Sequence, residues 1–397
     1  MRRIDTTAGP MAGVLAGAVS CVLVGCGTAS PVQVGANADS VGSSSATAAA
    51  SASQSARSPQ GAGDSSGSGP AGSAAATPSA AVAWVTGPPQ RGVDIDWYAG
   101  NLGPGNTVAN ESPEYANYVK QLGANWLSIT FPLFEASRTS SVVVRRAPTP
   151  SPADLTFLIQ AAHADGLSVV IRPLLDSSNL GHSRVHWTPP NLAKWFASYQ
   201  RVLMPYARMA QRDHVSVFTV GVEFDYLAGS SHWNSLDAAI RKVYKGRLAF
   251  ANNWDQLPGG KSYGGNGVRE DVDAYPAIHL PDSASVAALT RHWEAWDSQL
   301  HAGTVLGEVG IPAQLGMYPH PYWWKSREPL ARFVQVRWFA AACNAVVADH
   351  LGGIFFWSLT FGSSLTVPSG LADPGAWTAT HSASEIARCF SRLKNVK

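Results

Sequence analysis

Two glutamates, Glu223 and Glu308, each end an apolar stretch of the sequence, in VGVE and VLGE. A carboxylate at the end of a buried strand is destabilising unless it is paired, hydrogen-bonded or solvated in a cleft. Two carboxylates that face each other across a sugar-sized gap can cleave a glycosidic bond, because one protonates the leaving oxygen while the other attacks the sugar or activates water. A structural ion pair is the alternative for each glutamate taken alone.

Eight β-rich stretches alternate with amphipathic helical stretches and would position these glutamates. The expected strands are 92–97, 125–131, 168–174, 217–223, 247–252, 271–275, 304–308 and 353–357. The expected helices are 112–123, 152–165, 192–212, 235–244, 284–300, 328–350 and 383–393. Ser112 is expected to cap the first helix, with Pro113 at its first position. The Gly-rich residues 257–268 predict a loop between strands five and six.

This alternation predicts an α/β fold, a (β/α)8 TIM barrel within residues 84–397. An open doubly wound sheet is the alternative, but no G-x-G-x-x-G motif follows the first strand. Catalytic residues of such a barrel lie at the carboxyl ends of its strands. Strands four and seven stand on nearly opposite sides of the ring, so Glu223 and Glu308 should face each other across its mouth. The other strand ends carry Asp96, Trp97, Arg172, Asn252, Asn253, Tyr275 and Trp357.

Four short motifs occur at these strand ends. They are VGVEF around Glu223, DAYP around Tyr275, LGEVG around Glu308 and FFWSL around Trp357. In their order and placement, residues 91–361 resemble the clan A glycoside hydrolases. The stretches GVDIDW and LGANWLSITF make the chain most similar to glycoside hydrolase family 113, the β-mannanase-like family.

The resemblance implies a retaining mechanism, with Glu223 as general acid/base and Glu308 as the nucleophile that forms a covalent glycosyl-enzyme intermediate. Tyr275 would donate a hydrogen bond to the nucleophile, and Trp357 would form the platform under the sugar. Packing in the wall or core of the barrel is the alternative for both aromatic residues.

The chain departs from the clan pattern at Val222, where many members have an asparagine that contacts the sugar 2-hydroxyl. Arg172 or Asn253 could supply this contact. Arg172 could instead pair with a carboxylate of the barrel.

Aromatic residues are concentrated near the expected mouth. The loop of residues 316–329 is expected to form sugar-stacking subsites, or alternatively a lid packed on itself; it holds Tyr318, Tyr322, Trp323 and Trp324. Trp187 could extend the cleft. The residues expected to bind substrate are Trp97, Arg172, Asn253, Trp254, Tyr275 and Trp357.

The N-terminal segment has the pattern of a targeting signal, because Arg2 and Arg3 precede an apolar run over residues 11–25. The run ends in LVGC, which resembles a bacterial lipobox and predicts lipidation of Cys26. A secretory signal cut near residues 28–30 is the alternative. Residues 27–83 are mostly Ser, Ala and Gly and predict a disordered linker. The expected division is a signal at 1–26, a linker at 27–83 and the catalytic domain at 84–397.

Cys343 and Cys389 fall on expected helices, and an exported protein permits a disulfide between them; two free buried thiols are the alternative. The net charge of +2 favours no nucleic acid. The sequence lacks HExxH, P-loop and G-x-S-x-G motifs, and His182, His186 and His232 are expected to be solvated, so no metal or cofactor is implied.

These features predict an exported, monomeric glycoside hydrolase of the bacterial cell envelope, attached to the membrane only through its lipid anchor. It would cleave a β-linked polysaccharide or oligosaccharide, with β-mannan favoured. A non-catalytic polysaccharide-binding lipoprotein is the alternative from another class. A third possibility is an enzyme that trims an exopolysaccharide made by the same cell.

Overall fold

The structure, a computed structural model, describes residues 87–181, 183–256, 263, 267–324 and 327–396. The described residues belong to one compact unit. The predicted signal segment, Cys26, the linker and the expected domain start at residue 84 lie outside the described residues. None of the described helices is long and apolar enough to cross a membrane.

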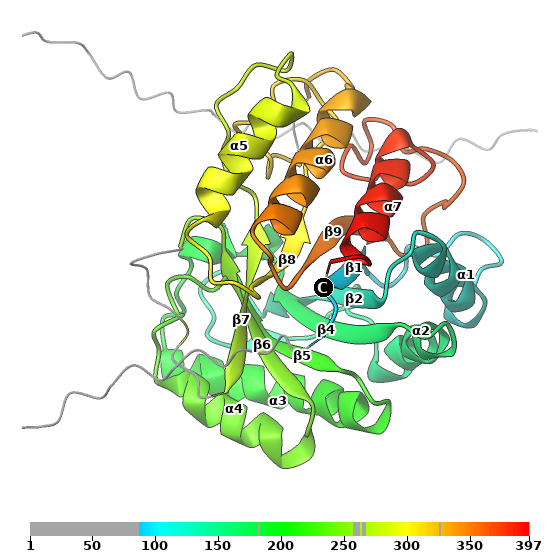
Figure 1. Cartoon of the computed structure of the whole chain (residues 1–397). Coiled ribbons are helices and arrows are strands. Elements are labelled where there is room, and N and C mark those ends of the chain that lie inside the picture. Colours follow the sequence, from blue (N-terminus) through cyan, green and yellow to red (C-terminus); the bar gives the residue numbers. More distant parts are fainter. Residues whose placement is uncertain (1–86, 182, 257–262, 264–266, 325–326, 397) are drawn as a thin grey trace, which may run out of the picture. The chain divides into compact units, whose positions relative to one another are not determined.

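Eight parallel strands close into a barrel (Figure 1), which confirms the predicted fold. The ring closes because the first strand pairs with both the second and the last. One further strand, β3, is short and antiparallel to β2. The strands are β1 Gln90–Asp96, β2 Trp126–Glu135, β3 Val143–Val144, β4 Ser168–Leu175, β5 Val217–Val222, β6 Arg247–Asn253, β7 Val268–Ala274, β8 Val305–Val309 and β9 Gly353–Thr360. The fourth and seventh strands of the barrel are therefore β5 and β8.

Helices cover the outside of this barrel (Figure 1). They are α1 Val108–Gln121, α2 Pro152–Ala164, α3 Leu192–Arg212, α4 His232–Val243, α5 Val286–Asp297, α6 Arg332–Ala348 and α7 His381–Leu393. With helices outside and side chains filling the inside, barrel strands are buried on both faces, and every residue of β5 and β8 is buried.

The first helix begins earlier than expected. Its N-cap is Thr107, not Ser112, and the Thr107 hydroxyl accepts a hydrogen bond from the Asn110 backbone while the Asn110 side chain accepts one from the Thr107 backbone. This reciprocal pair satisfies two amides that would otherwise lack partners. Pro113 consequently lies inside the helix, and the Ser112 hydroxyl donates to the carbonyl of Val108.

Between β6 and β7, the described residues form no helix, in agreement with the predicted loop; residues 257–262 and 264–266 of this connection lie outside the described part. Tyr263 anchors the connection to the barrel. Its ring stacks on Phe250 with centroids 4.5 Å apart, and its hydroxyl donates to Asp237 at 2.5 Å.

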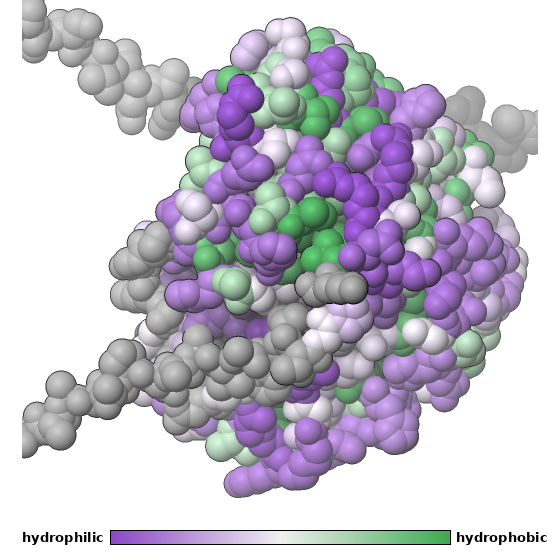
Figure 2. All heavy atoms as spheres, in the orientation of Figure 1, coloured by the Kyte–Doolittle hydropathy of each residue, from purple (hydrophilic) through white to green (hydrophobic). Residues whose placement is uncertain are grey.

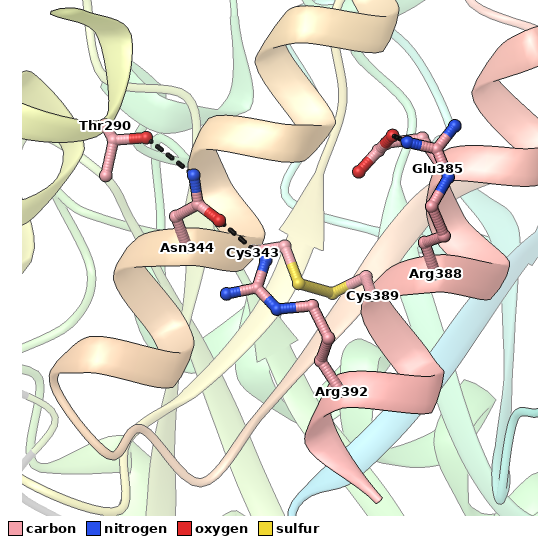
Figure 3. The surroundings of a disulfide bond; sticks show 7 residues. All are labelled: Thr290, Cys343, Asn344, Glu385, Arg388, Cys389 and Arg392. Atoms are coloured by element: carbon pink, nitrogen blue, oxygen red, sulfur yellow. Dashed lines mark hydrogen bonds and ion pairs between the residues drawn. A yellow bond between two sulfur atoms is a disulfide. The ribbon is translucent and has the colours of Figure 1, made fainter. Parts of the chain in front are cut away.

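A disulfide joins Cys343 on α6 to Cys389 on α7 (Figure 3). Both residues are buried, and their Cα atoms are 5.7 Å apart. Arg392 on α7 donates to the Asn344 side chain at 2.6 Å, and Asn344 donates to Thr290 at 3.0 Å. The last helix is thus attached to α6 by both a covalent bond and polar contacts.

Candidate active site

A cavity of about 760 Å³ lies at the carboxyl ends of the barrel strands, and both Glu223 and Glu308 line it. Glu223 follows β5, and Glu308 lies within β8. The other residues that line the cavity include Asp96, Tyr98, Arg184, Asn253, Trp254, Asp255, Tyr275, Tyr322, Trp324, Trp357 and Asp373. The structure therefore brings the two glutamates to one concave site.

The backbone of Glu223 adopts an unusual conformation. Its φ is 53°, in the left-handed region that a residue with a Cβ rarely occupies and that costs about 1–2 kcal/mol. The conformation is held by a hydrogen bond from the Glu223 amide to the carbonyl of Ala251 at 2.8 Å. Backbone strain of this kind is concentrated at functional sites, where the surrounding structure maintains it.

The side chain of Glu223 pairs with Arg184. An Arg184 Nη2 donates to the Glu223 carboxylate at 2.5 Å, and the two side chains are 17% and 10% exposed. Arg184 belongs to the short 3-10 turn Arg184–His186 between β4 and α3. Sequence analysis missed it, because a loop residue has no hydrophobic periodicity to indicate its direction.

Glu308 accepts two hydrogen bonds that fix its carboxylate. The Tyr275 hydroxyl donates to Oε2 at 2.8 Å, the contact expected for this tyrosine, and Arg172 donates to Oε1 at 2.7 Å. Arg172 also donates to Asp273 at 2.8 and 2.9 Å. A Cβ at position 307 would lie 2.7 Å from Arg172 Nη1, so the glycine of the LGE motif makes room for this guanidinium.

Three buried carboxylates surround the single guanidinium of Arg172. Burial raises the pKa of Glu308 to about 8, with Arg172 opposing and Glu223 and Asp94 adding to the rise. Burial likewise raises the pKa of Asp94 to about 7. Arg172 donates its hydrogen bonds to Asp273 and Glu308. It donates none to Asp94, on which Arg172 acts only through its positive charge, lowering the pKa of that carboxyl. The hydrogen bonds that Glu308 accepts from Arg172 and Tyr275 favour its ionised form, whereas burial opposes ionisation.

Four of the six expected substrate-binding residues line the cavity: Asn253, Trp254, Tyr275 and Trp357. Arg172 does not, because it is 2% exposed and lies against Glu308 and Asp273, which corresponds to the ion-pair alternative. Asn253 donates to Asp255 at 2.7 Å at the cavity wall.

Trp97 does not reach the cavity, which corrects the expectation that it binds substrate. It is 2% exposed and stacks on Phe361 with ring centroids 4.0 Å apart. Successive side chains of an extended segment point to opposite sides, so its neighbours Asp96 and Tyr98 line the cavity in its place. Trp187 is also buried, against Trp195, and does not extend the cleft.

The loop after β8 divides its aromatic residues among three environments. Tyr318 is buried and stacks on Trp338. Tyr322 and Trp324 line the cavity. Trp323 is 51% exposed and stacks on His320 with centroids 4.0 Å apart. The loop is therefore both a cavity wall and a packed segment.

The expected solvated histidines differ in their surroundings. His186 lines the cavity, and its ring meets the edge of Tyr226 at a centroid distance of 5.3 Å. His232 stacks on Phe196 at 5.0 Å. His182 lies outside the described residues.

Comparison with known proteins identifies the group to which this site belongs. Residues 101–362 match Glycoside Hydrolase Family 113. The β-mannanase AaManA from Alicyclobacillus acidocaldarius, solved in complex with ManMIm, shares 18% identity at a TM-score of 0.63, over 78% of this chain and 99% of that one. A structure described as a complex of a GH113 β-1,4-mannanase shares 17% identity at a TM-score of 0.62, over 77% and 99% of the two chains.

A more distant similarity extends to family 5. A Glycoside Hydrolase Family 5 mannosidase from Rhizomucor miehei, solved as a mutant in complex with mannosyl-fructose, shares 12% identity at a TM-score of 0.51, over 78% of this chain and 93% of that one. These likenesses between solved structures concern the fold. No curated protein matches the chain in sequence.

Proposed function

The chain belongs to glycoside hydrolase family 113, and on that premise we propose that it is a retaining β-glycosidase in which Glu223 and Glu308 carry out the chemistry. One observation supports these roles above all: side chains from the fourth and seventh barrel strand ends line a single cavity. Family membership makes the protein a glycoside hydrolase, and the stereochemistry and the residue roles are the proposal.

In the first step of the proposed mechanism, the Glu308 carboxylate attacks the anomeric carbon. The bond from that carbon to the leaving oxygen breaks, and protonated Glu223 gives its proton to this oxygen. In the second step, Glu223 removes a proton from water, the water oxygen bonds to the anomeric carbon, and the bond to Glu308 breaks. Tyr275 and Arg172 hold the Glu308 carboxylate throughout.

The proposed substrate is β-mannan, cleaved as by an endo-β-1,4-mannanase. The similar structures of the same family are described as β-1,4-mannanase and β-mannanase. Trp254, Trp324 and Trp357 give the cavity aromatic surfaces on which a neutral sugar can stack. Asn253 remains the proposed contact for the sugar 2-hydroxyl.

A panel of β-linked glycans with NMR analysis of the products tests the substrate and the stereochemistry together. We expect cleavage of β-mannan within the chain and products that retain the β configuration. Products of inverted configuration would contradict the role of Glu308 as nucleophile. Binding of glycans without cleavage of any would favour the non-catalytic alternative.

Substitution of the glutamates tests their roles. Glu223→Gln and Glu308→Gln should each lower kcat by several orders of magnitude while thermal unfolding stays cooperative. Activity near the wild-type level in Glu308→Gln would overturn the mechanism.

The proposed location is the bacterial cell envelope, with the monomeric barrel attached through a lipid on Cys26. The disulfide between Cys343 and Cys389 supports this proposal, because such bonds persist in oxidising compartments. Mass spectrometry of the mature N-terminus should find acylated Cys26. An unmodified start beyond that residue would leave secretion without an anchor.

A further inference from the structure

Charge is distributed unevenly over the outside of the barrel. All four acidic residues between positions 177 and 254 are buried: Asp213, Glu223, Asp225 and Asp237. Exposed basic residues occur throughout the same segment, although the net charge of the whole chain is only +2. The exposed surface of this segment therefore carries positive charge that none of its own carboxylates offsets.

The helix α3 carries a straight stripe of this charge. Lys194, Arg201 and Arg208 are exposed and follow one another at intervals of seven residues. Seven residues of an α-helix complete two turns to within about 20°, so the three side chains leave the helix in nearly the same direction over a length of about 21 Å. Helix α3 contains no acidic residue.

Two basic residues of neighbouring elements lie beside α3. Arg145, just after β3, lies over the ring of Tyr206 on α3, with 5.6 Å from its Cζ to the ring centroid. Lys245, just after α4, donates its backbone amide to the Gln211 side chain at 2.7 Å, beside the end of α3. Both side chains are exposed. We call Arg145, Lys194, Arg201, Arg208 and Lys245 the basic face.

The basic face is available to a partner. Among the described residues, none of its five members forms an ion pair, whereas the nearby Arg212 is paired with Asp213. The face contributes no residue to the cavity lining. Figure 2 shows hydrophilic residues along the lower edge of the molecule, where α3 and α4 lie in Figure 1.

We propose that the basic face docks on the anionic phospholipid headgroups of the membrane that carries the anchor. Clusters of Lys and Arg bind such surfaces through long-range attraction, which salt weakens. The expected anchor at Cys26 and the linker of residues 27–83 would keep the barrel at an r.m.s. distance of about 40 Å from the bilayer, as for a flexible chain of that length. A soluble anionic polymer would lack this enforced proximity.

Docking on the basic face leaves the cavity accessible. The helix α3 runs along the wall of the barrel, whereas the cavity opens at the carboxyl ends of the strands. A barrel lying on this wall would turn its mouth to the side, so a polysaccharide could enter parallel to the membrane. The proposal is independent of which sugar the enzyme cleaves.

Vesicle binding of the full chain tests the proposal, with Cys26→Ser in all proteins to exclude acylation. Vesicles containing phosphatidylglycerol are compared with vesicles of phosphatidylcholine alone, at low and high salt. We expect about tenfold tighter binding to the anionic vesicles at low salt, and loss of this preference at high salt. Because Arg2 and Arg3 of the N-terminal segment also favour anionic vesicles, its contribution is removed by comparing variants that share this segment.

Triple variants locate the interaction, and the two glutamate variants among them change the net charge of the protein equally. Lys194→Glu, Arg201→Glu and Arg208→Glu together should abolish the preference, and the corresponding triple glutamine variant should reduce it. Exposed cations of other elements serve as the control: Lys120→Glu, Arg291→Glu and Lys394→Glu together should retain it.

Three results would overturn the proposal. They are equal losses in the two glutamate variants, no preference for anionic vesicles in the parent protein, and binding to a soluble polyuronate with no binding to vesicles. The last result would assign the basic face to an anionic polymer. Catalytic activity of each variant on a soluble glycan should equal that of the parent, because none of the substituted residues lines the cavity.

Discussion

The Glu308 carboxylate receives one neutral and one charged hydrogen bond, from Tyr275 at 2.8 Å and from Arg172 at 2.7 Å. A bond to a charged group contributes about 1.5–3 kcal/mol. Tyr275→Phe should therefore lower kcat by about 10- to 100-fold, measured on a soluble β-mannan, with the fold intact. Tyr206→Phe, which removes a buried hydroxyl bonded to the Pro150 carbonyl, is the matched control and should leave kcat unchanged.

A second prediction at the residue scale follows from the left-handed backbone conformation of Glu223. Glycine adopts a φ of 53° without steric penalty, whereas alanine has a Cβ and pays the same steric penalty as glutamate. Glu223→Gly and Glu223→Ala both remove the carboxylate and should both be inactive. The glycine variant should nevertheless be more stable than the alanine variant by about 1 kcal/mol in urea unfolding. Equal stability, or a more stable alanine variant, would mean that the backbone relaxes when the carboxylate is lost.

At the scale of elements, the disulfide between α6 and α7 closes a loop with a sequence separation of 46 residues. A loop of this length predicts a contribution of about 4 kcal/mol from the restricted unfolded chain, and measured values are usually about 2–4 kcal/mol. The variant with Cys343→Ala and Cys389→Ala should lose this much unfolding free energy. Reductant should destabilise the wild-type protein and have no effect on the variant, and activity at room temperature should be unchanged because neither cysteine lines the cavity.

The elements could be predicted from sequence where a periodic pattern was present. The alternation of strands and helices sufficed for the barrel and for the two glutamates at strand ends, because that pattern reflects burial. It could not show whether Asp96 or Trp97 faces the mouth, since a shift of one residue reverses the direction of a strand side chain. Arg184 was missed because a 3-10 turn in a loop has no such period.

At the scale of the whole molecule, the barrel buries several carboxylates whose pKa values rise toward neutral pH because of burial. Burial raises the pKa of Asp225 and of Glu135 to about 7, as it does that of Asp94. A carboxyl with a raised pKa binds its proton in the folded state over a pH range in which the unfolded chain has lost it. The unfolding free energy therefore falls as pH rises through that range.

Asp297, the last residue of α5, is a further buried carboxyl with a raised pKa, and it does not line the cavity. Burial raises its pKa to about 8, and the nearby charge of Asp349 adds to the rise. The wild-type protein should lose stability as pH rises between about 3.8 and about 8, and this contribution should level off above that range. Asp297→Asn keeps the shape without a titrating proton, so unfolding by urea at a series of pH values should show a flatter slope and higher stability at pH 8. Glu114→Gln, at an exposed position on α1, should preserve the wild-type slope; the same slope in Asp297→Asn would mean that this carboxyl is ionised in the folded protein.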